Sequence, residues 1–397
     1  MDLYLQMGHG MQSLAKEFIS QWNGGNLIIS PVNIKQTQLI KYAKEIKLLG
    51  GKLLFDPQLF TPRDAHSKLQ EYDYWPSGTI SNGDILNNID NELLKLNEQI
   101  NTEHIILPGT LIKETNFANV YNQITFHSKF FRDKTNKKLL ATLCFSSESL
   151  RNHSFIEQSL SYFKLLDVDG FYVVPEPIKG CYINSDALWE MGLLKLITCL
   201  KLLNKIVILG YAHHQSLIAS LAKVDAICSG TYMNTRAFNQ EKFQSYKDDD
   251  IKHRSTWYYL PDAFSEYKAT LLDIANQRNF LSELFLPANE LTNKYSSMLF
   301  SGAIPSSTNY NETNSFKHYL FCLKKQCELL TANNYDDVYN CYEFMLNAAD
   351  CKIKKLKAKG IRGQNRDFEP GLEVNRIAMC ALNEDYGMKL RFEWNNI

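Results

Sequence analysis

The chain has 397 residues, of which 45% are hydrophobic and 22% charged, as in an ordinary folded protein with one large core or a core plus an appended domain. Its 43 basic and 43 acidic side chains balance, so no overall charge attracts the protein to nucleic acid or membrane, and such binding needs a local patch. Because Met1-Asp2-Leu3 is not the basic start of a signal peptide and the most apolar long stretch, residues 193–210, carries three lysines, we expect a cytoplasmic protein without a membrane segment.

Eight short apolar runs in the first 230 residues predict β-strands, and most of them end at a glycine, a proline or a polar residue. The predicted strands are residues 3–7, 27–30, 52–56, 104–107, 139–145, 170–174, 205–209 and 225–229. Each run is followed by a segment whose apolar residues recur with helical periodicity. In residues 34–49, for example, this periodicity ends at Gly50-Gly51. Strand-helix alternation predicts a parallel sheet, and eight repeats predict an α/β fold of the (β/α)8 TIM-barrel type.

Two connections in the predicted barrel are long. Residues 57–83 hold three prolines together with Tyr72, Tyr74 and Trp75, and such an aromatic loop is a candidate lid over a substrate. Residues 232–261 include the aromatic cluster that begins at Trp257, and helical text from Asp262 onward is expected to close the barrel.

The pattern changes near Pro287 to a loop rich in Ser, Thr and Asn, followed by helical text over residues 315–359. We therefore predict a barrel over residues 1–286 and a mainly helical C-terminal region over residues 287–397. A basic stripe in that region is a candidate contact for nucleic-acid phosphates, and its members are Lys352, Lys354, Lys355, Lys357, Lys359 and Arg362. The alternative is a solvated helix face with a basic loop. The C-terminal helices are also a candidate surface for a homo-oligomer or a partner protein.

The catalytic candidates come from the carboxyl ends of the strands, where barrel enzymes place their chemistry. Asp56 follows a wholly apolar strand, so it is a candidate general base or an acceptor of a hydrogen bond from a bound ring. The alternative is an aspartate that caps the next loop. Glu176 lies between two prolines and is a candidate catalytic acid, or else a loop carboxylate that faces solvent.

Other polar and aromatic residues at the strand ends are candidate ligand contacts. They are His9, Asn33, Gln58, His213, Ser229, Gly230, Tyr232, Asn234, Arg236 and Trp257. Arg236 has the planar donor fork that clamps phosphate or carboxylate, although a structural ion pair explains it equally well. Trp257 is a candidate stacking surface for a base, or else part of the core. Gly210 and Gly230 end the last two strands, where barrels often bind phosphate through backbone amides.

No metal site or cofactor is expected from the sequence. His213 and His214 are adjacent, but no His-x-His pattern or third histidine ligand accompanies them. The nine cysteines are scattered and contain no Cys-x-x-Cys pair, which favours reduced thiols over a structural zinc site or a disulfide framework.

Two segments resemble the tRNA-guanine transglycosylase superfamily, which includes deazaguanine-inserting relatives that modify DNA. In that family a strand ending in Thr-Asp-Ser-Gly-Gly-Phe carries an essential aspartate, and Phe55-Asp56-Pro57-Gln58-Leu59-Phe60 is similar to it. A strand ending in a glycine turn, a short helix and a strand leading to Thr-Arg resemble the segment from Ile208 to Thr235-Arg236. The resemblance covers roughly residues 25–240 and implies a glycosyltransferase that exchanges a nucleobase at an N-glycosidic bond.

The resemblance also places the nucleophilic aspartate of the family at Gly230, and the family's cysteine-histidine zinc site has no counterpart. Two functions therefore stand. The first is an enzyme, a transglycosylase or an N-glycoside hydrolase, that acts on a nucleobase-type small molecule or on nucleic acid. The second is a catalytically degenerate barrel that binds nucleotide or nucleic acid as part of a larger complex. A small-molecule barrel enzyme unrelated to nucleobases is a broader third.

Overall fold

The computed structural model describes residues 1–397 except 63–65, 67, 77–82, 245–254 and 287–289. Eight parallel strands form one curved sheet in the order β3-β2-β1-β9-β8-β7-β6-β4, with the short β5 (Leu111–Ile112) beside β6. The eight strands are β1 (Asp2–Gln6), β2 (Gly25–Ile29), β3 (Gly51–Phe55), β4 (Ile105–Leu107), β6 (Leu139–Phe145), β7 (Gly170–Pro175), β8 (Ile206–Leu209) and β9 (Ala226–Ser229). Each lies where the sequence predicts one, so the predicted (β/α)8 barrel is confirmed.

The barrel is nearly closed, with its seam between β3 and β4. No ladder joins these two strands, but the Glu103 N–H donates to the Leu53 carbonyl at 2.8 Å across the seam. A short β4 explains the incomplete ladder, because the chain reaches Pro108 after only three strand residues and proline has no N–H to donate.

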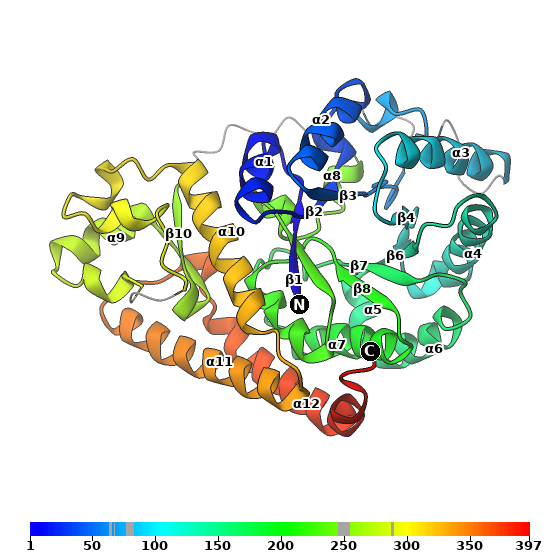
Figure 1. Cartoon of the computed structure of the whole chain (residues 1–397). Coiled ribbons are helices and arrows are strands. Elements are labelled where there is room, and N and C mark those ends of the chain that lie inside the picture. Colours follow the sequence, from blue (N-terminus) through cyan, green and yellow to red (C-terminus); the bar gives the residue numbers. More distant parts are fainter. Residues whose placement is uncertain (63–65, 67, 77–82, 245–254, 287–289) are drawn as a thin grey trace.

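Helices surround the sheet (Figure 1). They are α1 (Gln12–Gln21), α2 (Gln36–Leu48), α3 (Gly83–Gln99), α4 (Phe117–Lys134), α5 (Ser147–Arg151), α6 (His153–Phe163) and α7 (Ala187–Leu202). In α3 the buried residues Leu86, Ile89 and Leu93 recur every three or four positions, which gives the helix one apolar face toward the barrel. The helical text after β8 forms a 3-10 helix, His214–Ala222, and the short α8 (Glu241–Gln244) follows β9.

The remaining chain builds a lobe and a helical layer beside the barrel (Figure 1). The elements of this part are β10 (Trp257–Leu260), β11 (Ser265–Lys268), α9 (Ala269–Gln277), α10 (Glu312–Leu329), α11 (Tyr335–Ala358) and α12 (Glu369–Glu393). β10 and β11 pair as an antiparallel hairpin. α12 packs along α7, and α10 packs against both β10 and β1.

The prediction of a barrel-closing helix from Asp262 is wrong. Pro261 begins a 3-10 turn, and Phe264 has a left-handed backbone with φ of 45°, so the chain reverses into the β10-β11 hairpin. The helical text begins as α9 only at Ala269, and α9 packs against β11, while α10 covers β1. β10, β11 and α9 therefore pack with the C-terminal helices, although the boundary at residue 286 remains a prediction.

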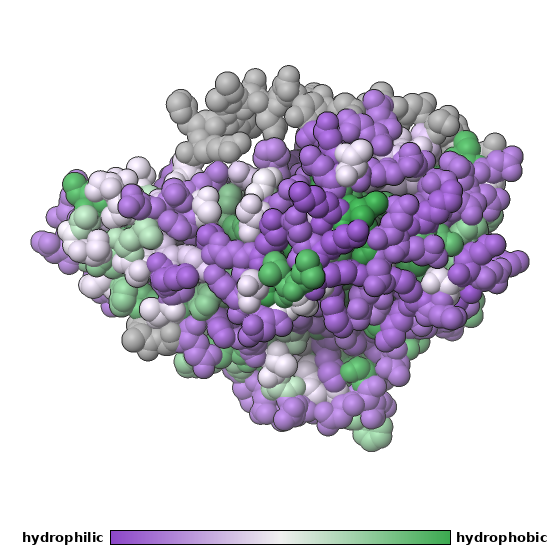
Figure 2. All heavy atoms as spheres, turned by 45° about the horizontal axis from the view of Figure 1, so that its top comes forward, coloured by the Kyte–Doolittle hydropathy of each residue, from purple (hydrophilic) through white to green (hydrophobic). Residues whose placement is uncertain are grey.

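Within the described residues, no helix is long and apolar enough to cross a membrane. Figure 2 shows a face that is mainly hydrophilic, with hydrophobic side chains gathered in separate patches.

Candidate functional site

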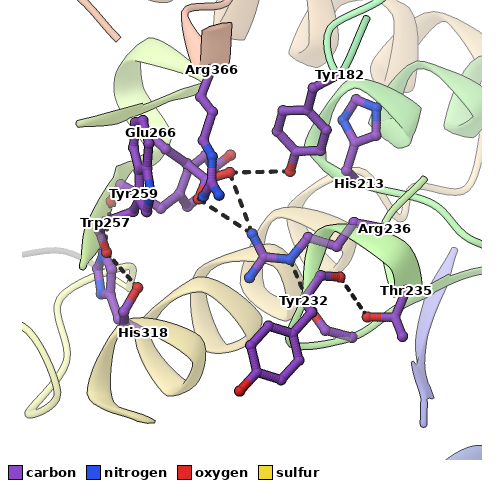
Figure 3. Close-up of polar contacts among 12 residues, drawn as sticks. Tyr182, His213, Tyr232, Thr235, Arg236, Trp257, Tyr259, Glu266, His318 and Arg366 are labelled. Carbon is purple, nitrogen blue, oxygen red and sulfur yellow. Dashed lines mark hydrogen bonds and ion pairs between the residues drawn. The ribbon is translucent and has the colours of Figure 1, made fainter. Parts of the chain in front are cut away.

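A buried ion-pair cluster joins the segment after β9 to the β10-β11 hairpin (Figure 3). Arg236 follows the 3-10 turn after β9, Glu266 lies in β11, and Arg366 lies in a 3-10 turn before α12. Glu266 accepts hydrogen bonds from Arg366 Nη1 at 2.7 Å and from Arg236 Nη1 at 3.3 Å. Tyr182 Oη donates to the same carboxylate at 3.1 Å. The structural ion pair considered for Arg236 is therefore present, with two arginines on one acid.

The electrostatics of this cluster follow from its burial. Glu266 and Arg236 are each 2% exposed, so both charges are largely removed from bulk solvent. Burial alone would raise the pKa of Glu266, but the guanidinium groups of Arg366 and Arg236 outweigh it and hold the pKa below its usual value. Each guanidinium also lies over a ring, Arg236 at 3.4 Å from the Tyr319 centroid and Arg366 at 4.1 Å from the Trp257 centroid.

A cavity of about 70 Å³ opens beside the two arginines. It is lined by Thr231, Tyr232, Met233, Arg236, Ser255, Trp257, Glu266, Glu312, Ser315, Phe316 and Arg366. Thr231 is 3% exposed, and its hydroxyl has no hydrogen-bond partner among the described residues. Arg366 uses only Nη1 in hydrogen bonds within the same set of residues. Since one water needs roughly 10–15 Å³ by this measure, the cavity has room for a phosphate or carboxylate group with water.

This cavity brings together three predicted ligand contacts, Tyr232, Arg236 and Trp257. Tyr232 Oη donates to Glu312 at 3.2 Å, and its ring meets Phe316 at a centroid distance of 4.8 Å. The Trp257 carbonyl accepts the Ser315 hydroxyl, which ties β10 to α10. The cavity therefore has two positive groups, two carboxylates and an aromatic wall.

Asp56 lies in a separate polar network inside the barrel. It is 1% exposed, and its Oδ2 accepts from Tyr211 Oη at 3.0 Å and from Tyr172 Oη at 3.3 Å. The Gln58 N–H donates to Oδ1 at 3.0 Å, and the Gln58 side chain donates to Tyr211 Oη at 3.0 Å and to Ser30. Burial raises the pKa of Asp56 to about 7, against the opposing effect of these hydrogen bonds.

Aromatic side chains cover this network on the side of the barrel mouth. Phe60, Phe238 and Phe243 contact one another at centroid distances of 5.0–5.6 Å, and each contacts the Tyr211 ring at 5.6–6.4 Å. Phe238 and Phe243 come from the segment after Arg236, so that segment closes the mouth above Asp56. An acid that titrates near neutral pH is thus present but shielded from solvent.

The predicted aromatic lid is core where the structure describes it. Tyr72 is 2% exposed and donates to the Ile34 carbonyl at 2.9 Å, and Tyr74 is 1% exposed and donates to the Pro57 carbonyl at 2.8 Å. Residues 63–65, 67 and 77–82 of that connection lie outside the described residues.

Glu176 and His213 serve local contacts. Glu176 Oε2 accepts the Ser147 N–H at 3.1 Å, and the structure gives it no hydrogen bond to the Asp56 network or the arginine cluster among the described residues. His213 Nδ1 accepts the Gln215 N–H at 3.3 Å at the start of the 3-10 helix after β8. Burial lowers the pKa of His213 to about 3, so its imidazole is neutral. Its ring lies 4.6 Å from that of Tyr182.

The other predicted contacts differ in exposure. His9 is exposed, whereas Asn33 donates to the Met7 carbonyl at 3.1 Å. Ser229 is fully buried, and Asn234 has a buried side-chain oxygen without a partner in the described part of the chain.

Gly210 and Gly230 provide space for neighbouring side chains. A β-carbon at Gly210 would lie 2.6 Å from the Tyr172 ring, and one at Gly230 would collide with the Thr235 side chain and the Gln6 carbonyl. The Gly210 N–H donates to Val173 within the sheet, and the Gly230 carbonyl accepts Arg236 Nε at 3.0 Å. These contacts account for both glycines without a phosphate.

Most lysines of the basic stripe are paired with acids. Lys354 meets Asp350 at 3.0 Å, and Lys357 meets Glu369 at 2.5 Å. Lys355 and Lys359 share Glu283, at 2.7 and 3.2 Å. Lys352 is half-buried and Arg362 is exposed. The pairing favours the solvated helix face over a phosphate-binding stripe.

Sequence reasoning missed Glu266 and Tyr182 as site residues. The one local signal for Glu266 is an acid close to the two aromatic residues Phe264 and Tyr267. No spacing rule connects it with Arg366, because 100 residues separate the two.

The protein is thus a (β/α)8 barrel, as its strand order shows, and it has a polar cavity beyond the carboxyl end of strand β9. No family model matches the chain, and no curated protein matches it. Among solved structures it is similar to the tetrameric deoxyribose phosphate aldolase of Aeropyrum pernix, with 13% identity and a TM-score of 0.36, over 62% of this chain and 89% of that one. The transglycosylase resemblance therefore remains a prediction.

Proposed function

We propose that the protein recognises a nucleotide-type ligand, with an anionic group and an aromatic ring, in the cavity between Arg236, Arg366 and Trp257. The observation that carries this proposal is the pair of guanidinium groups beside a cavity that also holds the buried Thr231 hydroxyl, which has no hydrogen-bond partner in the described part of the chain. Arginine forks and hydroxyls are the donors that proteins use for phosphate oxygens.

The lining of the cavity suits a ligand with both an anionic group and an aromatic ring better than it suits an inorganic anion. About 70 Å³ is enough for the phosphate but not for a nucleoside, so the ring of the ligand would extend beyond the cavity and pack against Tyr232 and Phe316, two partly exposed residues of its lining. Glu312 beside Tyr232 is an acceptor for a ribose hydroxyl or a base amine. An inorganic anion would use the two arginines but would also face Glu266 and Glu312, and it would make no use of Tyr232 and Phe316.

The test is calorimetric titration with the four nucleoside 5′-monophosphates, the matching nucleosides and inorganic phosphate. We expect one monophosphate to bind, and Arg366→Gln to weaken it at least tenfold, since a hydrogen bond to a charged group contributes about 1.5–3 kcal/mol. Arg362→Gln is the matched control, because Arg362 is exposed four residues earlier. Equal loss in both variants, or no binding by any monophosphate, would overturn the proposal.

A second candidate function is cleavage or transfer at an N-glycosidic bond, and Asp56 favours it. A carboxyl at the end of β3 with a pKa of about 7 is suited to general acid-base chemistry near neutral pH. Substrate access would require Phe238 and Phe243 to move. The test compares wild type and Asp56→Asn with nucleosides and with nucleic acid as substrates: a released base from wild type alone supports catalysis, and no product from either leaves ligand binding as the function.

A further inference from the structure

A second cavity, of about 460 Å³ and widely open to solvent, lies at the amino ends of the strands, away from the cluster around Glu266. Lys47 from the last turn of α2, Lys52 from β3 and Lys137 from the segment before β6 line it, and Glu103 is its acidic residue. It lies next to the β3-β4 seam, where Glu103 makes the backbone hydrogen bond to Leu53.

Two of the lysines converge on one residue. Lys47 Nζ donates to the Asn101 carbonyl at 2.6 Å, and Lys137 Nζ donates to Asn101 Oδ1 at 3.2 Å. Lys137 also donates to the Thr102 carbonyl. Lys52 is paired with Glu103 at 2.8 Å, so the acid of the cavity is already engaged. Within the described residues, the Lys47 and Lys137 ammonium groups thus lie on one asparagine and neither forms an ion pair with a carboxylate.

The pKa values reflect this arrangement. Burial lowers the pKa of Lys137, and repulsion from Lys47 lowers it further. Burial also lowers the pKa of Lys47, with Glu103 opposing the change. An anion between the two lysines would remove the repulsion.

A role in holding the loop explains each lysine singly, because lysines often donate to carbonyls at helix ends. It does not explain why two like charges share one asparagine beside a cavity far larger than a water site. Lys47 uses one of its three donors in these hydrogen bonds, so its ammonium group retains donors for a ligand.

We infer that this lysine cavity binds the phosphate or diphosphate group of a ligand, separately from the cavity of the proposed function. Lysine is a common point-charge partner of phosphate, and the volume admits a group with several oxygens. The phosphate has two possible sources, a small molecule and a nucleic-acid backbone.

The test uses inorganic pyrophosphate and a single-stranded oligonucleotide, each titrated at low ionic strength into the full-length protein. We expect Lys47→Gln and Lys137→Gln each to weaken one of these ligands at least threefold, and Lys47→Arg to retain it. Lys138→Gln is the matched control, because it removes the same charge from the neighbouring exposed position.

Arg366→Gln separates this site from the other cavity, and it should leave the lysine-dependent binding unchanged. If the lysine variants bind pyrophosphate more weakly than wild type does, the ligand is a small phosphorylated molecule. If they weaken only the binding of the oligonucleotide, the ligand is a nucleic acid. Binding of neither probe by wild type, or equal weakening in Lys138→Gln, would overturn the inference. That result would leave the nucleotide proposal standing, because Arg366 tests it independently.

Discussion

Replacing Glu266 by glutamine removes the negative charge between two arginines. Arg366 is partly exposed and can be hydrated, but Arg236 is 2% exposed and would keep a buried, unpaired charge. Removing one partner of a buried ion pair costs about 3–5 kcal/mol. With an unfolding entropy of about 2.1 cal/mol/K per residue, a chain of 397 residues loses about 4–6 °C in Tm.

The assay is thermal and urea unfolding of wild type, Glu266→Gln and Glu369→Gln. Glu369 pairs with Lys357 at the surface, where an ion pair contributes about 0–1 kcal/mol, so this control should unfold close to wild type. If Glu266→Gln is destabilised no more than Glu369→Gln, the buried ion pair between Arg236 and Glu266 does not stabilise the fold.

The pH dependence gives the same prediction a second readout. The pKa of Glu266 is lower in the folded protein than its usual 4.5, so its contribution is complete above pH 4.5 and is lost as the pH falls through the folded value. The stability difference between wild type and Glu266→Gln should therefore shrink in acid. A difference that stays constant through this range would contradict the assigned pKa direction.

Three further predictions follow from single contacts. Because the pKa of Asp56 rises from 3.8 to about 7 on folding, the stability of wild type relative to Asp56→Asn should fall between pH 4 and 7, by up to about 4 kcal/mol, and stay level above; urea unfolding across this range checks it, and a flat difference contradicts it. Gly210→Ala places a methyl group 2.6 Å from the Tyr172 ring and should cost about 1–3 kcal/mol in the same assay, whereas Gly83→Ala, with nothing within 4 Å, should cost nothing. Lys357→Gln should leave oligonucleotide affinity and its salt dependence unchanged, because Glu369 already pairs with that ammonium group; a smaller salt slope in the titration would show a phosphate contact.

The strands could be predicted because their signals are local. An apolar run bounded by a terminator, such as residues 205–209 before Gly210, places a strand without knowledge of its neighbours. The hairpin after Pro261 could not be predicted in the same way. Its turn depends on the left-handed backbone at Phe264, which is unusual for a bulky residue and has no signal in the helical text around it.

The candidate site shows the same division between local and distant information. The strand-end rule selected Arg236 as a candidate, because the carboxyl ends of parallel strands meet at one edge, and Arg236 lines a cavity in the structure. Whether Arg236 pairs, and with which acid, depends on β11 and on the turn before α12, far along the chain. The burial of Asp56 likewise depends on Phe238 and Phe243, which follow β9 rather than β3.

The packing around Gly230 leaves no space for a nucleophilic side chain, which limits the mechanisms by which this barrel could cleave an N-glycosidic bond. The transglycosylase resemblance places a nucleophilic aspartate there, but a β-carbon at Gly230 would collide with the Gln6 carbonyl and the Thr235 side chain. A covalent intermediate at that position is therefore incompatible with this barrel, and Gly230→Asp should unfold the protein at lower urea rather than create base exchange. For the second candidate function we therefore expect hydrolysis with Asp56 as general base once Phe238 and Phe243 have moved, and a free base as the product.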